Sequence, residues 1–324
     1  MDQELWQLLK GVSRSFYLSV RFLPRKVRPA IALGYLAARA SDTIADANSL
    51  PAERRLEVLR QLRAQLFSLD PELKTNLQAC AKCQPDSRER QLLQDIDLVF
   101  GRIRALPLEQ QDLLRQVLEH IIRGQALDIE RFEVASSLRA LRSKEELEEY
   151  IYLVAGSVGE FWTKLCLQQF SGYSRIIASE IVSWGMEYGK GLQLVNVLRD
   201  FPNDVQSGRS YLPVTDPDSL SKDLRAAQSL FSEWRSVAAV YLDSGARYVQ
   251  AIRPARVKFA CALPVLIGRE TLKKLGTLPS AGEKVKVSRK RVYWFAILSL
   301  IIAVVPGADK VLLPPRTGTS LPAG

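Results

Sequence analysis

The chain has 324 residues, 47% of them hydrophobic and 25% charged, and is therefore long enough to bury a large core. Lysine and arginine outnumber aspartate and glutamate by 45 to 35, and the net charge of +10 favours anionic partners such as phosphates or acidic lipid headgroups. A single histidine, His120, excludes a metal site built on several imidazoles, and four scattered cysteines exclude a disulfide framework. Basic residues are spread along the chain without interleaved aromatic residues, so we expect no nucleic-acid binding.

Apolar residues recur with helical spacing along most of the chain, and no sustained two-residue alternation marks a strand. Pro71 and Pro85 bracket a segment that we interpret as a polar turn, and Ser143 followed by Glu146 predicts a capped helix start. The pattern therefore predicts an all-α protein, a single large helical bundle. The predicted helices occupy residues 27–46, 52–67, 87–104, 108–129, 144–170, 173–199, 219–248 and 254–275.

The sequence VYWFAILSLIIAVV at 292–305 is apolar on every helical face except at Ser299, and it follows a basic run. It is shorter than the ~20 residues that a spanning helix needs. It is either a buried final helix of the globular body or an attachment to an anionic membrane, on the surface or marginally spanning it. We therefore expect a domain over 1–291, a hydrophobic segment over 292–308 and a disordered tail over 309–324. The N-terminus shows no secretory signal, which predicts a cytoplasmic protein attached to the inner face of a membrane through this segment.

Two pairs of aspartates stand out because the members of each pair are four residues apart in an apolar helical stretch. They are Asp42 with Asp46 and Asp200 with Asp204. Residues at i and i+4 share a helix face, so the like charges repel and a positive group is expected beside them. Oxygen ligands without histidine or thiol select a hard cation, which predicts Mg2+.

Arginines accompany both pairs. Arg39 precedes the first pair, Arg199 precedes the second, and Arg209 follows it. Either aspartate pair by itself is compatible with a solvated helix face, but guanidinium groups bind phosphate oxygens in a bidentate manner, and the combination indicates a metal-bridged diphosphate site. Pro202 lies inside the second pair, so we expect the helix to kink or end there, and Asp204 to be the less certain metal ligand.

Several segments match a known pattern in order and spacing over about residues 10–275. They are SRSF at 13–16, YLAAR at 35–39 followed by DTIAD at 42–46, YIYLVAGSVG at 150–159, and QLVNVLRD at 193–200 followed by GRSYLP at 208–213. Together they resemble the squalene/phytoene synthase family of head-to-head prenyl synthases, and within it they look most like a bacterial squalene synthase.

This resemblance implies an isoprenoid-synthase fold with a central active-site cavity and with the two aspartate motifs on facing helices. Ionisation of an allylic diphosphate leaves negative charge that Mg2+ and arginines stabilise, and a dry cavity protects the cation from water. The residues implied to act in catalysis are Tyr150, Asp42, Asp46, Asp200 and Asp204, and those implied to hold the metal are Asp42, Asp46, Asn196, Asp200 and Asp204. The residues implied to bind the substrate are Ser13, Arg14, Phe16, Tyr35, Arg39, Val154, Ala155, Gln193, Asn196, Arg199 and Arg209.

The resemblance also implies condensation of two farnesyl diphosphates to presqualene diphosphate, followed by NADPH-dependent reduction to squalene. CALP at 261–264 resembles squalene synthases, whereas GRSYLP at 208–213 is closer to phytoene synthases. Synthesis of phytoene, dehydrosqualene or presqualene diphosphate without reduction therefore stays open. A more remote alternative is an inactive, membrane-associated assembly factor, which the retained aspartates and arginines disfavour. We expect a monomer whose partners are a prenyl diphosphate and a membrane surface.

Overall fold

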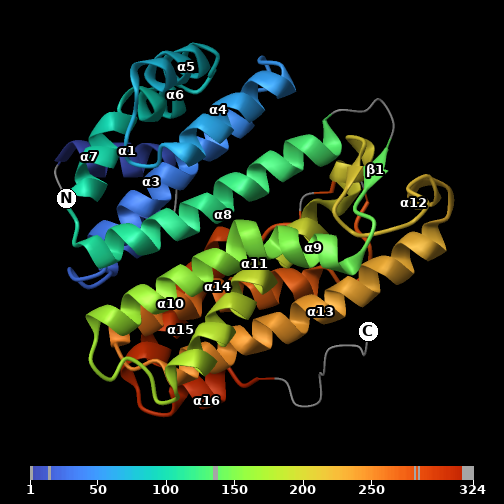
Figure 1. The fold of residues 1–324 in the computed structure, drawn as a ribbon. Coiled ribbons are helices and arrows are strands. Elements are labelled where there is room, and N and C mark those ends of the chain that lie inside the picture. The colour runs from blue at the N-terminus through green and yellow to red at the C-terminus, as the bar shows by residue number, and fades with distance from the viewer. Residues whose placement is uncertain (1–2, 14–15, 134–137, 281, 284, 316–324) are drawn as a thin grey trace. The chain divides into compact units, whose positions relative to one another are not determined.

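The computed structural model of the chain describes residues 3–13, 16–133, 138–280, 282–283 and 285–315, apart from the side chains of Leu18 and Ser221. The described residues are mainly α-helical, which confirms the all-α prediction (Figure 1). They form two compact units, residues 1–134 and 135–324. The sequence carries no linker that marks the boundary between these units, and the expected domain over 1–291 stays a prediction.

The first unit is organised around α3 (Arg28–Ala45), which packs against α4, α6, α7 and α8 (Figure 1). Pro29 in its first turn pre-sets the helical backbone, and small buried residues such as Ala32 and Ala37 let the neighbouring helices approach closely. The other helices of this unit are α1 (Gln3–Val12), α2 (Phe16–Phe22), α4 (Ala52–Ala64), α5 (Pro71–Lys82), α6 (Ser87–Gln94), α7 (Ile96–Arg104) and α8 (Leu108–Phe132).

The segment after Pro71 is helix α5, so its interpretation as a polar turn is wrong. Pro71 occupies the first helical position, where its missing N–H has no intrahelical role. The carboxylate of Asp70 caps the helix by accepting the N–H of Leu73 at 2.7 Å. Leu73 and Leu77 then bury one face, so the proline here begins a helix.

The second unit is organised around two long helices that pack side by side, α11 (Ala178–Gln206) and α13 (Leu224–Ala251) (Figure 1). A short parallel pairing of β1 (Arg139–Ala140) with β2 (Arg209–Ser210) lies at the end of α11. The remaining helices of this unit are α9 (Lys144–Ile151), α10 (Ser157–Gln169), α12 (Ser219–Lys222), α14 (Ala255–Lys274), α15 (Arg289–Val304) and α16 (Ala308–Leu312).

The predicted helix over 144–170 is divided by a π-helical turn. It begins as expected, because the Ser143 hydroxyl accepts the N–H of Glu146. After α9 the backbone changes to a π-helical turn, η1 (Tyr152–Gly156), and then continues as α10. Turns of this type are rare and often accompany functional sites.

Pro202 does not end α11, which continues to Gln206, so the predicted helix end at 199 is wrong. A proline inside a helix removes one backbone hydrogen bond and crowds the preceding turn, but packing of the neighbouring turns offsets this cost. Val197, Leu198 and Phe201 are buried there. Asp200 and Asp204 therefore lie one turn apart on one continuous helix.

Most of the hydrophobic segment over 292–308 forms α15, which packs against α14. The buried residues of α15 are Phe295, Ser299 and Ile302. No helix in the described part of the chain is both long enough and apolar enough to cross a membrane. Helix α16 falls in the segment that was expected to be disordered, where Asp309 is buried and forms an ion pair with Lys258 at 2.7 Å. The rest of the predicted tail, 316–324, lies outside the described residues.

Candidate active site

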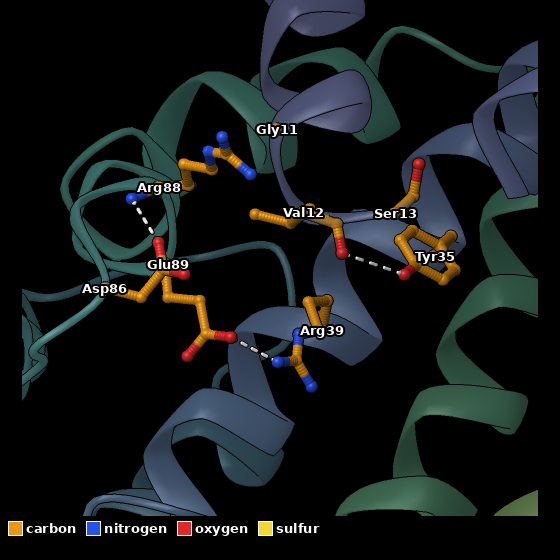
Figure 2. Close-up of a pocket in the computed structure, with 8 residues that line it drawn as sticks. All are labelled: Gly11, Val12, Ser13, Tyr35, Arg39, Asp86, Arg88 and Glu89. Carbon is orange, nitrogen blue, oxygen red and sulfur yellow. Dashed lines mark hydrogen bonds and ion pairs between the residues drawn. The ribbon is translucent and has the colours of Figure 1, made fainter. Parts of the chain in front are cut away.

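A pocket of about 530 Å3 in the first unit gathers several predicted substrate-binding residues (Figure 2). Tyr35 and Arg39 reach it from α3, and Ser13 reaches it from the end of α1. The Tyr35 hydroxyl donates to the carbonyl oxygen of Val12 at 3.2 Å. Phe16 stacks on the Tyr35 ring with centroids 4.6 Å apart, whereas Arg14 lies outside the described residues. The full lining is Gly11, Val12, Ser13, Tyr35, Arg39, Asp86, Arg88 and Glu89.

Arg39 joins this pocket to the first aspartate pair. Its guanidinium forms one ion pair with Asp42 and another with Glu89 on α6. Asp42 lies one turn after Arg39 on α3, and Asp46 is the residue that caps the C-terminal end of this helix. Glu89 was not among the residues predicted from the sequence, because nothing in the local sequence of α6 indicates that Glu89 meets α3.

The two carboxylates of this pair differ in their electrostatics. Burial raises the pKa of Asp42, and the Arg39 guanidinium opposes part of that rise. Asp46 is an exposed residue, yet the surrounding protein reduces the solvation of its carboxylate. This desolvation, followed by the charge of Asp42, raises the pKa of Asp46 to about 6. Negative charge therefore exceeds positive charge at this end of α3, which suits a bound cation.

The second unit contains a pocket of about 380 Å3 that gathers most of the predicted residues of α11. The pocket has one wall of polar side chains spaced along α11, with Tyr150 from α9 and residues around β2 completing it. The full lining is Tyr150, Gln193, Asn196, Val197, Asp200, Asn203, Asp204, Ser207, Arg209 and Tyr211.

Each aspartate of the second pair has its own arginine. The Arg199 Nη2 and Asp200 Oδ2 atoms are 2.5 Å apart, and the Arg209 Nε and Asp204 Oδ1 atoms are 2.9 Å apart. The residue Asp204 is only 6% exposed. Burial raises its pKa, and the Arg209 guanidinium counteracts that effect. At this site the negative charge is compensated within the protein itself.

Tyr150 lies in the second pocket, stacked on Tyr211 with ring centroids 4.7 Å apart. Tyr211 belongs to the GRSYLP segment but was not among the site residues predicted from the sequence. Val154 and Ala155 lie in η1, are half-buried, and are not part of the pocket lining. The roles of all these residues, and a single cavity between facing aspartate motifs, stay predictions.

The chemistry of the donor atoms in both aspartate pairs fits Mg2+. The pairs offer carboxylate oxygens, Asn196 adds an amide oxygen one turn before Asp200, and neither pair has a histidine or thiol beside it in sequence. Within the described ranges, no three Asp, Glu, His or Cys side chains converge as a metal-binding group. Mg2+ in proteins is commonly held by one or two carboxylates together with water and substrate phosphates, and each pair can supply that share.

Comparison with known proteins identifies the family. A family model described as squalene/phytoene synthase matches residues 9–292. The squalene synthase ERG9 of Saccharomyces cerevisiae is 28% identical over 208 residues, which cover 64% of this chain and 44% of the yeast protein. The mouse squalene synthase is 24% identical over 276 residues, covering 82% of this chain and 62% of the mouse protein. The matched part of the chain thus spans about half the length of the yeast relative.

Solved structures show the same fold. The complex of TcSQS with the ligand BPH1237 has a TM-score of 0.73 at 23% identity, covering 96% of this chain and 88% of that one. A dehydrosqualene synthase in complex with a ligand has a TM-score of 0.58 at 21% identity, covering 91% and 94%. These likenesses confirm the isoprenoid-synthase helical fold. Because the family model matches most of its length, the chain belongs to the squalene/phytoene synthase family, whose members are prenyltransferases.

Proposed function

We propose that this chain catalyses the Mg2+-dependent head-to-head condensation of two farnesyl diphosphates to presqualene diphosphate, followed by NADPH-dependent reduction to squalene. The observation that carries the proposal is an arrangement that occurs twice. At the C-terminal end of α3 and again on α11, two aspartates four residues apart accompany an arginine that is bonded to a carboxylate. Carboxylates that hold a cation and guanidinium groups that bind phosphate oxygens are together what a diphosphate leaving group requires.

In this proposal each arginine changes its binding partner when the substrate binds. In the free protein, carboxylates hold Arg39, Arg199 and Arg209. Mg2+, when bound, supplies a Lewis acid that offsets the charge of the diphosphate. Each guanidinium then turns from its carboxylate toward a diphosphate oxygen, where it stabilises the charge that develops as the leaving group departs.

Tyr150 is assigned the task of assisting diphosphate departure or proton removal. Its ring lies against Tyr211 in the pocket that Asp200 and Asp204 also line, where the leaving group is proposed to bind. The aromatic faces also stabilise positive charge that forms near them. Gln193 and Asn196, from the preceding turns of α11, are assigned to substrate and metal placement.

The reductive step is proposed on the family resemblance and on the squalene synthases among the relatives. NADPH would supply the hydride for this step. Within the described residues no glycine-rich nucleotide loop follows a strand. The second candidate is condensation without reduction, which the fold likeness to a dehydrosqualene synthase supports.

Product analysis tests these proposals. The purified full chain is incubated with farnesyl diphosphate and Mg2+, with and without NADPH, and products are identified by gas chromatography and mass spectrometry. Squalene that forms only with NADPH supports the two-step reaction. Presqualene diphosphate or dehydrosqualene formed regardless of NADPH rejects the reduction. Product from geranylgeranyl diphosphate alone moves the proposal to phytoene, and no product from either substrate contradicts catalysis and favours an assembly factor.

Membrane attachment is proposed through the outer face of α15. One face of this helix packs on α14, whereas Tyr293, Ile297 and Leu300 at helical spacing are exposed, as are Trp294 and Val304. An exposed basic group that comprises Lys286, Arg289, Lys290 and Arg291 precedes this apolar face. Apolar side chains next to cationic ones suit the interface of an anionic bilayer, with the aromatic pair at headgroup depth. We therefore propose a cytoplasmic protein that lies on the inner face of a membrane.

Vesicle sedimentation tests this attachment. The full chain is expected to sediment with vesicles of phosphatidylcholine and phosphatidylglycerol, and the double variant Ile297→Asp, Leu300→Asp is expected to remain in the supernatant. Leu224→Asp is the control, because Leu224 is also an exposed apolar residue but lies at the start of α13. Equal sedimentation of the double variant and the control would refute the role of α15.

A further inference from the structure

A charged network surrounds the π-helical turn of the second unit. The carboxylate of Glu148 on α9 accepts two hydrogen bonds, from Lys190 Nζ on α11 at 2.8 Å and from the Tyr241 hydroxyl on α13 at 2.6 Å. The side chains of Lys190 and Glu148 are only 15% and 22% exposed. Burial and this hydrogen bond raise the pKa of Tyr241, so its hydroxyl stays neutral and acts as a donor. One carboxylate therefore ties α9, α11 and α13 together.

Lys190 also contacts η1 directly. Its Nζ atom lies 5.9 Å from the ring centroid of Tyr152 and 5.9 Å from that of Tyr241, so the ammonium is near two aromatic faces at once. Its aliphatic stem crosses Gly156, where an added Cβ would lie 3.1 Å from Lys190 Cγ. The lysine thus touches both ends of the π-helical turn, and cation–π attraction adds to its ion pair with Glu148.

The π-helical turn needs such support from outside itself. A single π-helical turn interrupts the ordinary α-helical hydrogen bonding, and it persists where neighbouring elements hold it. α11 packs closely on this turn, since a Cβ on Gly189 would lie 2.3 Å from the carbonyl oxygen of Ala155. Lys190 follows Gly189 in sequence, so the close backbone packing and the lysine act at the same place.

The geometry of this turn determines the direction of Tyr150. A π-helical turn contains one residue more than an α-helical turn, and each residue of a helix rotates the chain by about 100°. Conversion of η1 to α-helix would therefore rotate α9 relative to α10. Tyr150, two residues before η1, would then leave its stacked position on Tyr211 in the second pocket.

We propose that Lys190 is a positioning residue, whose ammonium, held by Glu148 between the rings of Tyr152 and Tyr241, maintains the π-helical turn that directs Tyr150 into the second pocket. The assignment of a catalytic role to that pocket rests on the proposed function, whereas the control of the turn by Lys190 does not. Lys190 itself is not part of the pocket lining, so it acts through Tyr150.

The test compares Lys190→Met with a matched control. Methionine keeps the length of the stem and removes the charge. Lys164→Met removes a lysine from the same neighbourhood, since Lys164 forms an ion pair with Glu160 at 2.5 Å, and Glu160 accepts the Tyr152 hydroxyl at 3.0 Å. Lys164 is 40% exposed and does not bond Glu148. Lys190→Arg restores a cation at the same place and is expected to rescue the effect.

Hydrogen exchange, followed by mass spectrometry of the peptide that contains residues 150–157, reports the turn without any substrate. Lys190→Met is expected to speed exchange there about tenfold, with Lys164→Met within about twofold of the parent. For turnover of farnesyl diphosphate, Lys190→Met is expected to lower kcat about tenfold with KM within about twofold, because Tyr150 is displaced and the diphosphate contacts are kept.

The outcomes separate this inference from the proposed function. Unchanged exchange in Lys190→Met overturns the inference whether or not the chain is active. Faster exchange with unchanged kcat overturns the link from the turn to Tyr150. Where Lys190→Met does not fold, Tyr241→Phe removes only one hydroxyl of the network and is expected to show faster exchange at the same peptide, and unchanged exchange there refutes the proposal. An inactive parent chain contradicts the proposed function and leaves the exchange result to decide on the turn.

Discussion

The two aspartate pairs have the same spacing but different electrostatic surroundings. On α11, Asp200 is bonded to Arg199 and Asp204 to Arg209, so each carboxylate has its own cation. On α3, one arginine is shared between Asp42 and Glu89, and no arginine bonds Asp46 in the described part of the chain. The pair on α11 is compensated in the free protein, whereas the pair on α3 retains excess negative charge. Identical motif spacing therefore does not imply identical demand for a metal ion.

The largest expected effect is on turnover, and it should be similar for the two pairs when one aspartate of either is replaced. Asp42→Ala and Asp200→Ala should each lower kcat by roughly 10²–10³-fold, the range observed when one stabilising contact to a developing oxyanion is lost. Steady-state kinetics with farnesyl diphosphate measures this loss, and circular dichroism confirms that the helices are intact. Near-normal turnover of either variant would remove the metal clamp from the proposal.

The two pairs should differ in their contribution to the free energy of unfolding. Asp204→Asn should lower the free energy of unfolding by roughly 1–3 kcal/mol, because it weakens the charged hydrogen bond of a buried carboxylate to Arg209. Asp46→Asn should leave stability unchanged or slightly raised, because it removes repulsion with Asp42. Urea unfolding of both variants measures the contrast. Equal losses would show that the two pairs are electrostatically equivalent.

Addition of Mg2+ without substrate should reveal the same difference between the pairs as a smaller change in stability. Without substrate, Mg2+ at ten times its Kd should stabilise the parent chain by about 1.4 kcal/mol. Asp46→Asn should lose most of this gain, whereas Asp204→Asn should keep most of it, because the uncompensated charge is on α3. Thermal unfolding with Mg2+ and with EDTA measures the difference, and the reverse order of the two variants would place the first metal ion on α11.

The smallest expected effect comes from Glu89, which shares the Arg39 guanidinium with Asp42. Glu89→Gln removes one of the two carboxylate partners of that arginine and should leave it freer to bind a diphosphate. We expect KM for farnesyl diphosphate to fall about two- to threefold with kcat unchanged, in line with the small worth of a partly exposed ion pair. Gln91→Glu, a change on the outside of α6, is the control. A rise in KM would show that Glu89 holds Arg39 in its binding position.

Local sequence signals predicted much of the fold and the residue types of the site. The helical periodicity, the cap at Ser143 and the placement of Asp200, Gln193 and Asn196 on one helix follow from spacing alone, and the structure has them. Two helix boundaries were mispredicted from prolines. Pro71 begins a helix because proline is well suited to the first helical position, which the Asp70 carboxylate caps. Pro202 lies inside a helix because the packing of its buried neighbours offsets the cost of a proline there.

The sequence by itself determined that the protein is helical, that oxygen ligands and arginines cluster in motifs, and which family the chain resembles, because these depend on residue types at short separations. Only the tertiary structure decided that Glu89 meets Arg39, that Tyr211 stacks on Tyr150, and that Lys190 and Glu148 flank a π-helical turn. These contacts join residues far apart in the chain, and their energies come from burial and charge pairing that no local pattern records.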